Sequence, residues 1–264
     1  MKRINPKDQV HLRMMLYGQP GSTKTRTAAS ATFDARLRPV LMVNASGNPI
    51  AIRDYDPQPD ILELERLDEL DTVYYWVRAG QPDCAFQKGL GLARDYKTLI
   101  IDGTTEIQRF SFNQQRGPVG PGSFPAKVER QHFYNTLGQM VTFAKLFYDL
   151  PMNVLMTSLE ASDRDEGTGE LFYHPLLWGQ SEGEVCGYAY VVARMVHRAI
   201  LKRENPAAEK ALVKTDDPQG AELVSVALFT PTGKYYAKDQ YGALGTHMIN
   251  PTMTKIMDLI TGKE

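Results

Sequence analysis

The residues with the clearest chemical meaning lie in one short segment, GQPGSTKT, at positions 18–25. An apolar run ends at Gly18, and helix-forming residues follow Thr25. The segment is close to the phosphate-loop (P-loop, Walker A) pattern G-x-x-x-x-G-K-[ST], in which glycines let successive backbone N–H groups point at phosphate oxygens. Lys24 would reach the β- and γ-phosphates, and the Thr25 hydroxyl would bind Mg²⁺. We therefore expect a site for a nucleotide, with ATP as the first candidate.

The expected contacts to the nucleotide cover the whole loop and the start of the following helix. They come from Gly18, Gln19, Pro20, Gly21, Ser22, Thr23, Lys24, Thr25 and Arg26. The pattern normally has glycine at the position of Thr23, where a Cβ could crowd the approach of backbone to phosphate. Gly21 supplies some freedom, and hydroxyl groups can donate to phosphate. The alternative interpretation is an ordinary strand, turn and helix that happens to contain a lysine.

A second segment, TLIID at 98–102, would supply the other half of a metal site. Its apolar residues predict a buried strand that ends in Asp102, whose carboxylate would bind Mg²⁺ next to Thr25. Glu106 lies one helical turn further on. It either polarises the attacking water or is a first-turn acid that complements the helix dipole.

Two further polar positions follow apolar segments in the way that nucleotide-contacting residues do. Thr157, with Ser158 next to it and Glu160 nearby, would sense the γ-phosphate or would simply cap the end of a strand. Lys238 would reach a phosphate of its own subunit or of a neighbour, or would be a solvated lysine in a loop.

Composition limits the other functions that the chain could have. The formal net charge of the 264 residues is −1, so a nucleic-acid partner would need a local basic patch. Cys84 and Cys186 lie far apart, and the five histidines have no metal-ligand spacing, so we expect neither a zinc site nor a disulfide framework. The first residues do not resemble a secretory signal, and no apolar run is long enough for a membrane span. We expect a cytoplasmic protein.

Apolar segments alternate with helical patterns along the chain. Expected strands are 12–17, 39–44, 97–102, 152–158, 188–200 and 223–229, and expected helices are 61–79, 127–149 and 251–261. This alternation predicts an α/β fold with a mostly parallel sheet and helices on both faces, in a single domain over residues 1–264. Two long polar connections, 113–126 and 161–184, are expected as loop insertions that are either surface excursions or partner-binding loops. A third polar stretch, 203–222, is expected to be a solvated excursion.

The order of these segments resembles the phage-encoded RecA-core P-loop ATPases, known as phage nucleotide-binding proteins, some of which are single-strand annealing recombinases. The resembling segments are YGQPGSTKT, YKTLIIDGTTEIQR, PMNVLMTSLEA, PLLWGQSEGEVCGYAYVVARM, YYAKDQYGALG and NPTMTKIMDLI, which together span most of residues 12–260. The segment around Lys238 is also similar to the KNRFG motif of RadA-type proteins. That similarity implies a role for Lys238 in an ATP site or at a subunit interface.

The resemblance implies a RecA-like ATPase core that uses ATP and Mg²⁺, binds single-stranded DNA, forms homo-oligomers and acts in the cytoplasm of a phage-infected host. By the same analogy, the two long connections would face DNA. The implied phosphate contacts are Arg116, Lys127, Arg130 and Arg164, and the implied stacking residues are Phe124 and Phe172.

Three positions depart from the family pattern. Thr23 replaces a glycine, Gln240 stands where the motif usually has arginine, and Ser46 stands where relatives often carry a catalytic glutamate. These departures predict slow hydrolysis or nucleotide binding without turnover. The competing hypotheses are therefore a DNA-stimulated ATPase, a non-hydrolysing nucleotide-binding module, and another phage ATPase such as a packaging motor or a loader.

Overall fold

A computed structural model of the chain describes residues 11–262 except 48, 118–127, 165, 168, 180, 202–211 and 214–220. The strands are β1 (Arg13–Gly18), β2 (Val40–Asn44), β3 (Asp60–Glu63), β4 (Thr98–Asp102), β5 (Asn153–Arg164), β6 (Leu171–Pro175), β7 (Val191–Leu201), β8 (Leu212–Val213), β9 (Ala221–Leu228), β10 (Lys238–Asp239) and β11 (His247–Ile249). The helices are α1 (Lys24–Ala29), α2 (Leu67–Arg78), α3 (Ala85–Gly89), α4 (Thr104–Arg116), α5 (Arg130–Tyr148), α6 (Ser181–Tyr188) and α7 (Met253–Thr261). Short 3₁₀ turns cover Ser30–Phe33 and Ile50–Ile52.

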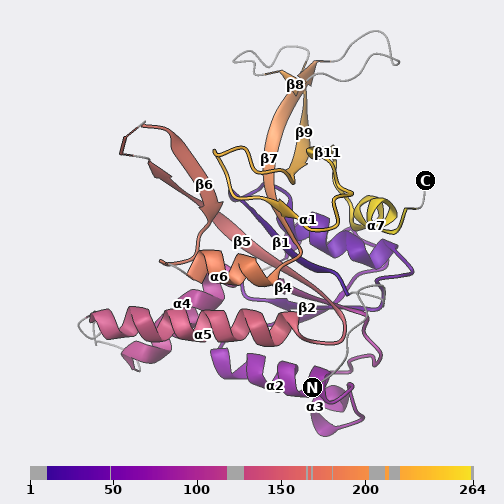
Figure 1. The fold of residues 1–264 in the computed structure, drawn as a ribbon. Coiled ribbons are helices and arrows are strands. Elements are labelled where there is room, and N and C mark those ends of the chain that lie inside the picture. Colours follow the sequence, from indigo (N-terminus) through magenta and orange to yellow (C-terminus); the bar gives the residue numbers. More distant parts are fainter. Residues whose placement is uncertain are drawn as a thin grey trace, which may run out of the picture.

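A mixed, mostly parallel sheet forms the centre of the molecule (Figure 1). The strand order is β11-β9-β7-β1-β5-β4-β2-β3. β1 pairs in parallel with β5 on one side and with β7 on the other, and parallel pairing continues from β5 through β4 and β2 to β3. β9 and β11 extend the sheet beyond β7 in antiparallel pairs. The predicted α/β class with a mostly parallel sheet is confirmed.

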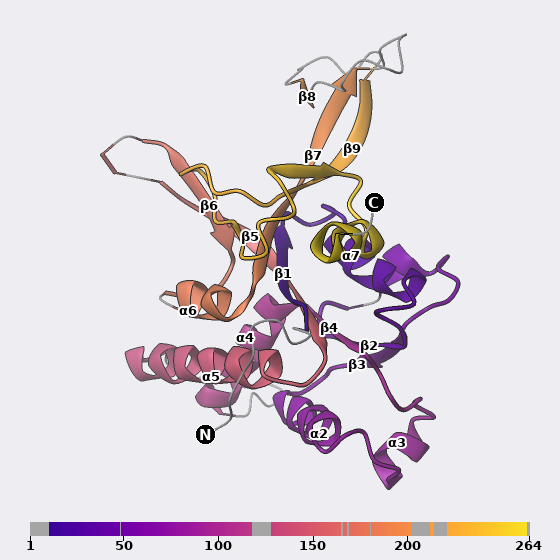
Figure 2. The same ribbon diagram turned by 45° about the vertical axis from the view of Figure 1, so that its right-hand side comes forward.

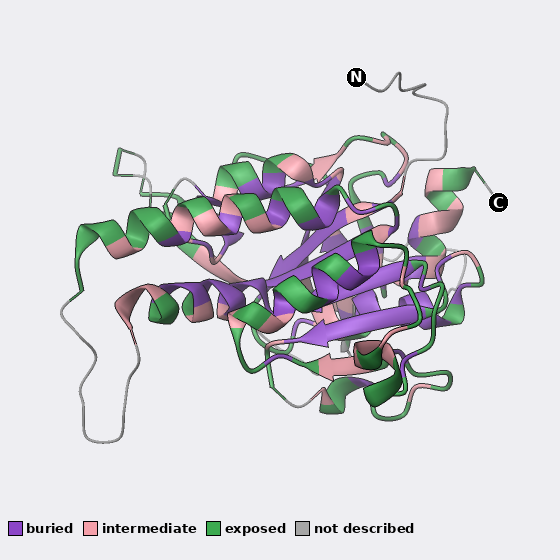
Figure 3. Ribbon diagram, turned by 90° about the horizontal axis from the view of Figure 1, so that it is seen from below, coloured by how far each residue is buried: buried purple, intermediate pink, exposed green. Residues whose placement is uncertain are grey.

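Two hydrophobic clusters, one on each face of the sheet, fix the helices in place. On one face, Tyr17 and Ile101 belong to a cluster that includes buried side chains of α2, α4, α5 and α6. On the other face, Leu16 and Ile100 belong to a cluster with α1 and α7. Neighbouring residues of a strand point to opposite faces, so a strand that is apolar throughout supplies both clusters. Figure 2 shows the helices on both sides of the sheet, and Figure 3 shows that the central strands are buried.

Several predicted boundaries were wrong. The apolar spacing at 61–79 predicted one helix, but the segment begins within β3 and only continues as α2. The connection 161–184 was expected as a loop, but it contains the end of β5, the strand β6 and the start of α6. Arg164 and Leu171 pair across this β5–β6 hairpin, which projects away from the helical layers (Figure 2). Cross-strand pairing gives polar residues a regular structure that their composition did not predict.

Most residues of the other two polar connections, 113–126 and 203–222, are not among those that the structure describes. In 113–126, α4 continues to Arg116, and 118–127 are not described. In 203–222, the short strand β8 and the start of β9 are described, whereas the remaining residues are not.

Candidate functional site

Parallel pairing brings the ends of β1 and β4 alongside β5, which continues beyond them to Arg164, so Thr157 lies within a strand and not at its end. Gly18 at the end of β1 lies opposite Leu159 of β5, and Asp102 at the end of β4 lies opposite Thr157 of β5. The carboxyl ends of parallel strands are where α/β proteins hold their ligands. The predicted loop and the predicted acid therefore share one edge of the sheet.

The loop between β1 and α1 has the tight backbone that its glycines suggested. A Cβ on Gly18 would lie 2.3 Å from the Met195 carbonyl oxygen, so only glycine fits there. Gly21 has a φ of +79°. Thr23 has a φ of +66°, a left-handed conformation in which a β-branched residue is strained. A glycine, which the phosphate-loop pattern has at this position, would adopt such a backbone without strain.

The Thr23 hydroxyl holds the strained residue in place by a hydrogen bond. Its Oγ1 lies 2.5 Å from the Ser225 Oγ of β9. The Thr23 side chain accepts no hydrogen bond from the backbone of α1, so it does not cap the helix. The first backbone N–H groups of a helix have no partner within the helix. The N–H groups of Lys24 and Thr25 therefore lie where the start of a helix could donate to an anion.

The Lys24 side chain folds back over the loop. Its Nζ donates to the carbonyl oxygens of Gly18 and Gln19, each at 2.8 Å, and lies 3.4 Å from the Ser22 Oγ. Burial lowers the pKa of Lys24 to about 8, while the negative charges of Asp102 and Glu160 act in the opposite direction. The buried Lys24 ammonium contacts two neutral carbonyl oxygens in place of water. A negatively charged partner would stabilise its charge more strongly.

Hydroxyl groups surround the Asp102 carboxylate, which is 2 % exposed. The Thr25 hydroxyl donates to both carboxylate oxygens, at 3.0 Å to Oδ1 and 2.9 Å to Oδ2. The Thr157 hydroxyl donates to Oδ1 at 2.5 Å, and the Ser46 hydroxyl donates to Oδ2 at 3.1 Å. The structure thus brings together Thr25, Asp102 and Thr157, as the sequence predicted, and adds Ser46.

This donor set suits Mg²⁺ better than a softer metal. One carboxylate and one threonine hydroxyl are hard oxygen ligands, and Mg²⁺ usually takes one or two such protein ligands together with phosphates and waters. Within the described residues, no group of three or more His, Cys, Asp or Glu side chains could hold a metal by itself. A divalent ion here would therefore depend on the oxygens of a bound phosphate.

Two residues that the sequence suggested for catalysis have other partners. Glu106 lies in the first turn of α4 and forms an ion pair with Arg109, at 2.5 Å from its Nη1 to Oε1. The Lys238 Nζ donates to the carbonyls of Gly187 and Ala189, at 3.0 and 2.7 Å, and so satisfies the C-terminal end of α6.

Lys238 also lies at a different level of the sheet from the loop. It pairs with Val192 of β7, whereas Gly18 pairs with Met195, three residues further along the same strand. Three residues of a strand correspond to about 10 Å. Within one subunit, Lys238 therefore lies toward the amino ends of the strands. Gln240 lies on the same segment, where its N–H donates to the Tyr190 carbonyl at 3.0 Å.

The described residues among the proposed DNA contacts lie on two different parts of the fold, the helices α4 and α5 and the β5–β6 hairpin. The Arg116 guanidinium lies 5.5 Å from the Phe112 ring centroid, and Arg130 is the first residue of α5. The Arg164 Nε donates to the Gly169 carbonyl, and Phe172 stacks on His174, both within the β5–β6 hairpin. Lys127 and Phe124 lie outside the described residues.

A cavity of about 510 Å³ adjoins the loop on the side of β5 and β7. Gln19, Pro20 and Ser22 contribute to its lining, together with an ion pair between Glu160 and Arg194. The sequence pointed to Glu160 only as a neighbour of Thr157. It gave no signal for Arg194, because that residue lies 34 positions away and meets Glu160 only when β5 and β7 flank β1.

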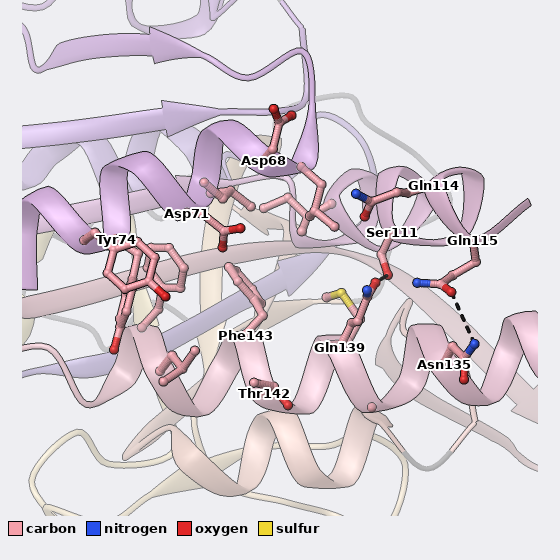
Figure 4. Close-up of a pocket in the computed structure, with 18 of the residues that line it drawn as sticks. Asp68, Asp71, Tyr74, Ser111, Gln114, Gln115, Asn135, Gln139, Thr142 and Phe143 are labelled. Atoms are coloured by element: carbon pink, nitrogen blue, oxygen red, sulfur yellow. Dashed lines mark hydrogen bonds between the residues drawn. The ribbon is translucent and has the colours of Figure 1, made fainter. Parts of the chain in front are cut away.

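Two further cavities have different surroundings. One of about 350 Å³ adjoins the other side of the loop at Thr23 and Arg26, with Tyr55 and Asn250 among its lining residues. The other, about 730 Å³, lies between α2, α4 and α5 and shares no lining residue with the loop. Figure 4 shows this cavity, where Ser111 bonds to Gln139 and Gln115 bonds to Asn135 across the two helices α4 and α5.

Among the helices that the structure describes, none has the length and apolar character needed to cross a membrane. No protein-family model matches the chain, and no curated protein matches it.

Proposed function

We propose that the chain binds a nucleoside triphosphate, with ATP as the expected one, together with Mg²⁺ at residues 18–25, and that it hydrolyses the triphosphate. The contact between Thr25 and Asp102 carries this proposal. These residues come from different elements and lie 77 positions apart, yet their oxygens are within 3.0 Å. A hydroxyl and a carboxylate at that separation could share one metal ion.

The chain's own residues suggest how the phosphates would be held. Lys24 would exchange the carbonyls of Gly18 and Gln19 for phosphate oxygens, which carry a full negative charge. The N–H groups at the start of α1 would donate to the same phosphates. Thr157 and Ser46 hold the Asp102 carboxylate in a fixed orientation, so little rearrangement is needed when the metal binds. When bound, Mg²⁺ would neutralise charge on the β- and γ-phosphates.

The RecA-like assignment, single-stranded DNA as partner, homo-oligomers and action in the host cytoplasm remain part of the proposal. They are supported by the resemblance of the sequence segments to that family and by the mostly parallel sheet, in which β1 leads directly into the loop 18–25. Non-hydrolysing binding is the second candidate. Ser46 favours it, because a serine that bonds to Asp102 cannot replace a glutamate as a base.

A matched pair of variants at Thr25 tests the metal site by calorimetric titration of ATP with and without Mg²⁺. Thr25→Ser keeps the hydroxyl, and Thr25→Val keeps the shape without it. We expect wild-type protein and Thr25→Ser to bind ATP more tightly when Mg²⁺ is present, and Thr25→Val to lose most of that difference. A flat titration of folded wild-type protein would refute the proposal.

Turnover of radiolabelled ATP separates the two candidate functions. We expect phosphate release by wild-type protein, faster with single-stranded DNA and absent in Lys24→Ala. Tight binding with no release under any of these conditions would favour the non-hydrolysing module.

A further inference from the structure

A buried ion pair lies beside the loop and has no role in holding the metal. The Arg194 Nε donates to the Glu160 Oε2 at 2.6 Å, and its Nη2 donates to Oε1 at 3.1 Å. The side chains are 4 % exposed for Glu160 and 11 % for Arg194. Taking two charges out of water costs free energy that their attraction does not always recover. Stability alone is therefore a weak reason for this pair.

Strand register places the pair at the end of β1, where the loop begins. Arg194 of β7 lies opposite Tyr17, and on the other side of β1, Leu159 of β5 lies opposite Gly18, one residue before Glu160. The pair thus bridges β5 and β7 over the last residues of β1. It lines the cavity of about 510 Å³ together with the loop residues Gln19, Pro20 and Ser22.

Glu160 lies near the lysine of the loop. It lines the same cavity as Ser22, and the Ser22 Oγ lies 3.4 Å from the Lys24 Nζ. In the proposed complex this ammonium contacts the β- and γ-phosphates, so the cavity that Glu160 lines adjoins the place of those phosphates.

Arg194 retains hydrogen-bonding capacity and a fixed position. A guanidinium has five N–H donors, and the two bonds to Glu160 leave three without a partner among the described residues. Its Cζ lies 3.7 Å from the Tyr173 ring centroid and 5.6 Å from that of Tyr235. The two rings hold the guanidinium in place, and its free N–H groups can still bind phosphate oxygens.

The other acids near the site differ from Glu160 in role or position. Both oxygens of Asp102 accept hydrogen bonds from hydroxyl groups and form the expected metal ligand. Glu106 is paired with Arg109, as Glu160 is with Arg194, but Glu106 does not line the cavity beside the loop. Ser46 has no basic group. Among these residues, Glu160 is the carboxylate next to the loop that the metal site does not use.

We propose that Glu160 is the general base for the hydrolysis and that Arg194 binds the γ-phosphate. This inference rests on the proposed function. The water oxygen forms a bond to the γ-phosphorus, and the bond from that phosphorus to the β,γ-bridging oxygen breaks. Glu160 accepts the proton of the water, and the nucleoside diphosphate leaves with the bridging oxygen, whose charge Lys24 stabilises. The γ-phosphate then shares the charge of the Arg194 guanidinium, which weakens its hold on Glu160 and makes the carboxylate a better proton acceptor.

The test compares Glu160→Gln and Arg194→Lys with wild-type full-length protein, in ATP turnover and in calorimetric binding of ATP with Mg²⁺. Glu160→Gln keeps the shape and one acceptor for Arg194. We expect kcat to fall about 100-fold or more, because general bases contribute that much, while ATP affinity changes by less than about threefold. Arg194→Lys should lower kcat and also weaken ATP binding.

Asp34→Asn is the matched control. Asp34 forms an ion pair with Arg36, its side chain is also 4 % exposed, and neither residue is part of the loop or its cavity. We expect this variant to lower the unfolding temperature without changing kcat. A purely structural role for Glu160 would give the same pattern in Glu160→Gln.

The outcomes separate this inference from the proposed function. Wild-type protein that binds and hydrolyses ATP, with full kcat in Glu160→Gln, would overturn the inference and leave the proposed site intact. Wild-type protein that binds ATP but releases no phosphate would also overturn it. Absence of ATP binding by folded wild-type protein would remove the proposed function itself.

Discussion

The position of Lys24 predicts that ATP binding depends on pH in the mildly alkaline range. Burial lowers the pKa of this lysine to about 8, and Asp102 and Glu160 limit the shift. The free protein therefore loses the Lys24 charge as the pH rises through about 8. Only the protonated lysine makes a strong contact with phosphate, so ATP affinity should fall over the same range.

The magnitude follows from the fraction of protonated lysine. With a pKa of about 8, roughly 90 % of the lysine is charged at about pH 7 and roughly 10 % at about pH 9. The affinity for ATP with Mg²⁺ should therefore drop about tenfold between these values, or about 1.4 kcal/mol. The terminal phosphate interferes little, because its last pKa is about 6.

Calorimetry measures both the affinity for ATP and the number of protons that the protein takes up on binding it. Binding at a pH near the lysine pKa should take up roughly half a proton per ATP, seen as a dependence of the heat on the ionisation enthalpy of the buffer. Lys24→Met is the control and should bind weakly, with no change between the two pH values. Equal wild-type affinity at both values, without proton uptake, would show that the Lys24 ammonium does not contact the triphosphate.

Three other substitutions probe the loop and its surroundings. Gly18→Ala should abolish ATP binding and lower the free energy of unfolding in denaturant by about 1–3 kcal/mol, because the alanine Cβ would overlap the Met195 carbonyl. Normal ATP binding by this variant would mean that the loop can shift. Thr23→Gly should be more stable to unfolding than Thr23→Ala. Both variants lose the hydrogen bond to Ser225, but only glycine relieves the strain of the positive φ. A higher stability of Thr23→Ala would contradict the left-handed backbone at this position. Lys238→Met should lower the free energy of unfolding by about 1 kcal/mol, because it leaves the carbonyls of Gly187 and Ala189 at the end of α6 unpaired. An unchanged unfolding midpoint would show that water replaces the lysine.

The sequence predicted those features that depend on local patterns. The apolar runs before Gly18 and Asp102 are continuous, so they could be recognised as buried strands. The glycines and the lysine of the loop lie within eight positions, and their spacing follows from the backbone turn that they form. The prediction of a helix over 61–79 was wrong at its start, because a short edge strand can have apolar residues at helical spacing.

Contacts between distant residues were decided by the tertiary structure alone. Thr157 was expected to face a phosphate or to cap a strand end, but it bonds to Asp102 because β5 lies between β1 and β4. Arg194 meets Glu160 because β7 flanks β1 on its other side. Lys238 binds the end of α6 because β10 pairs with β7. Strand order and register follow from how the whole core packs, and no local spacing in the sequence encodes them.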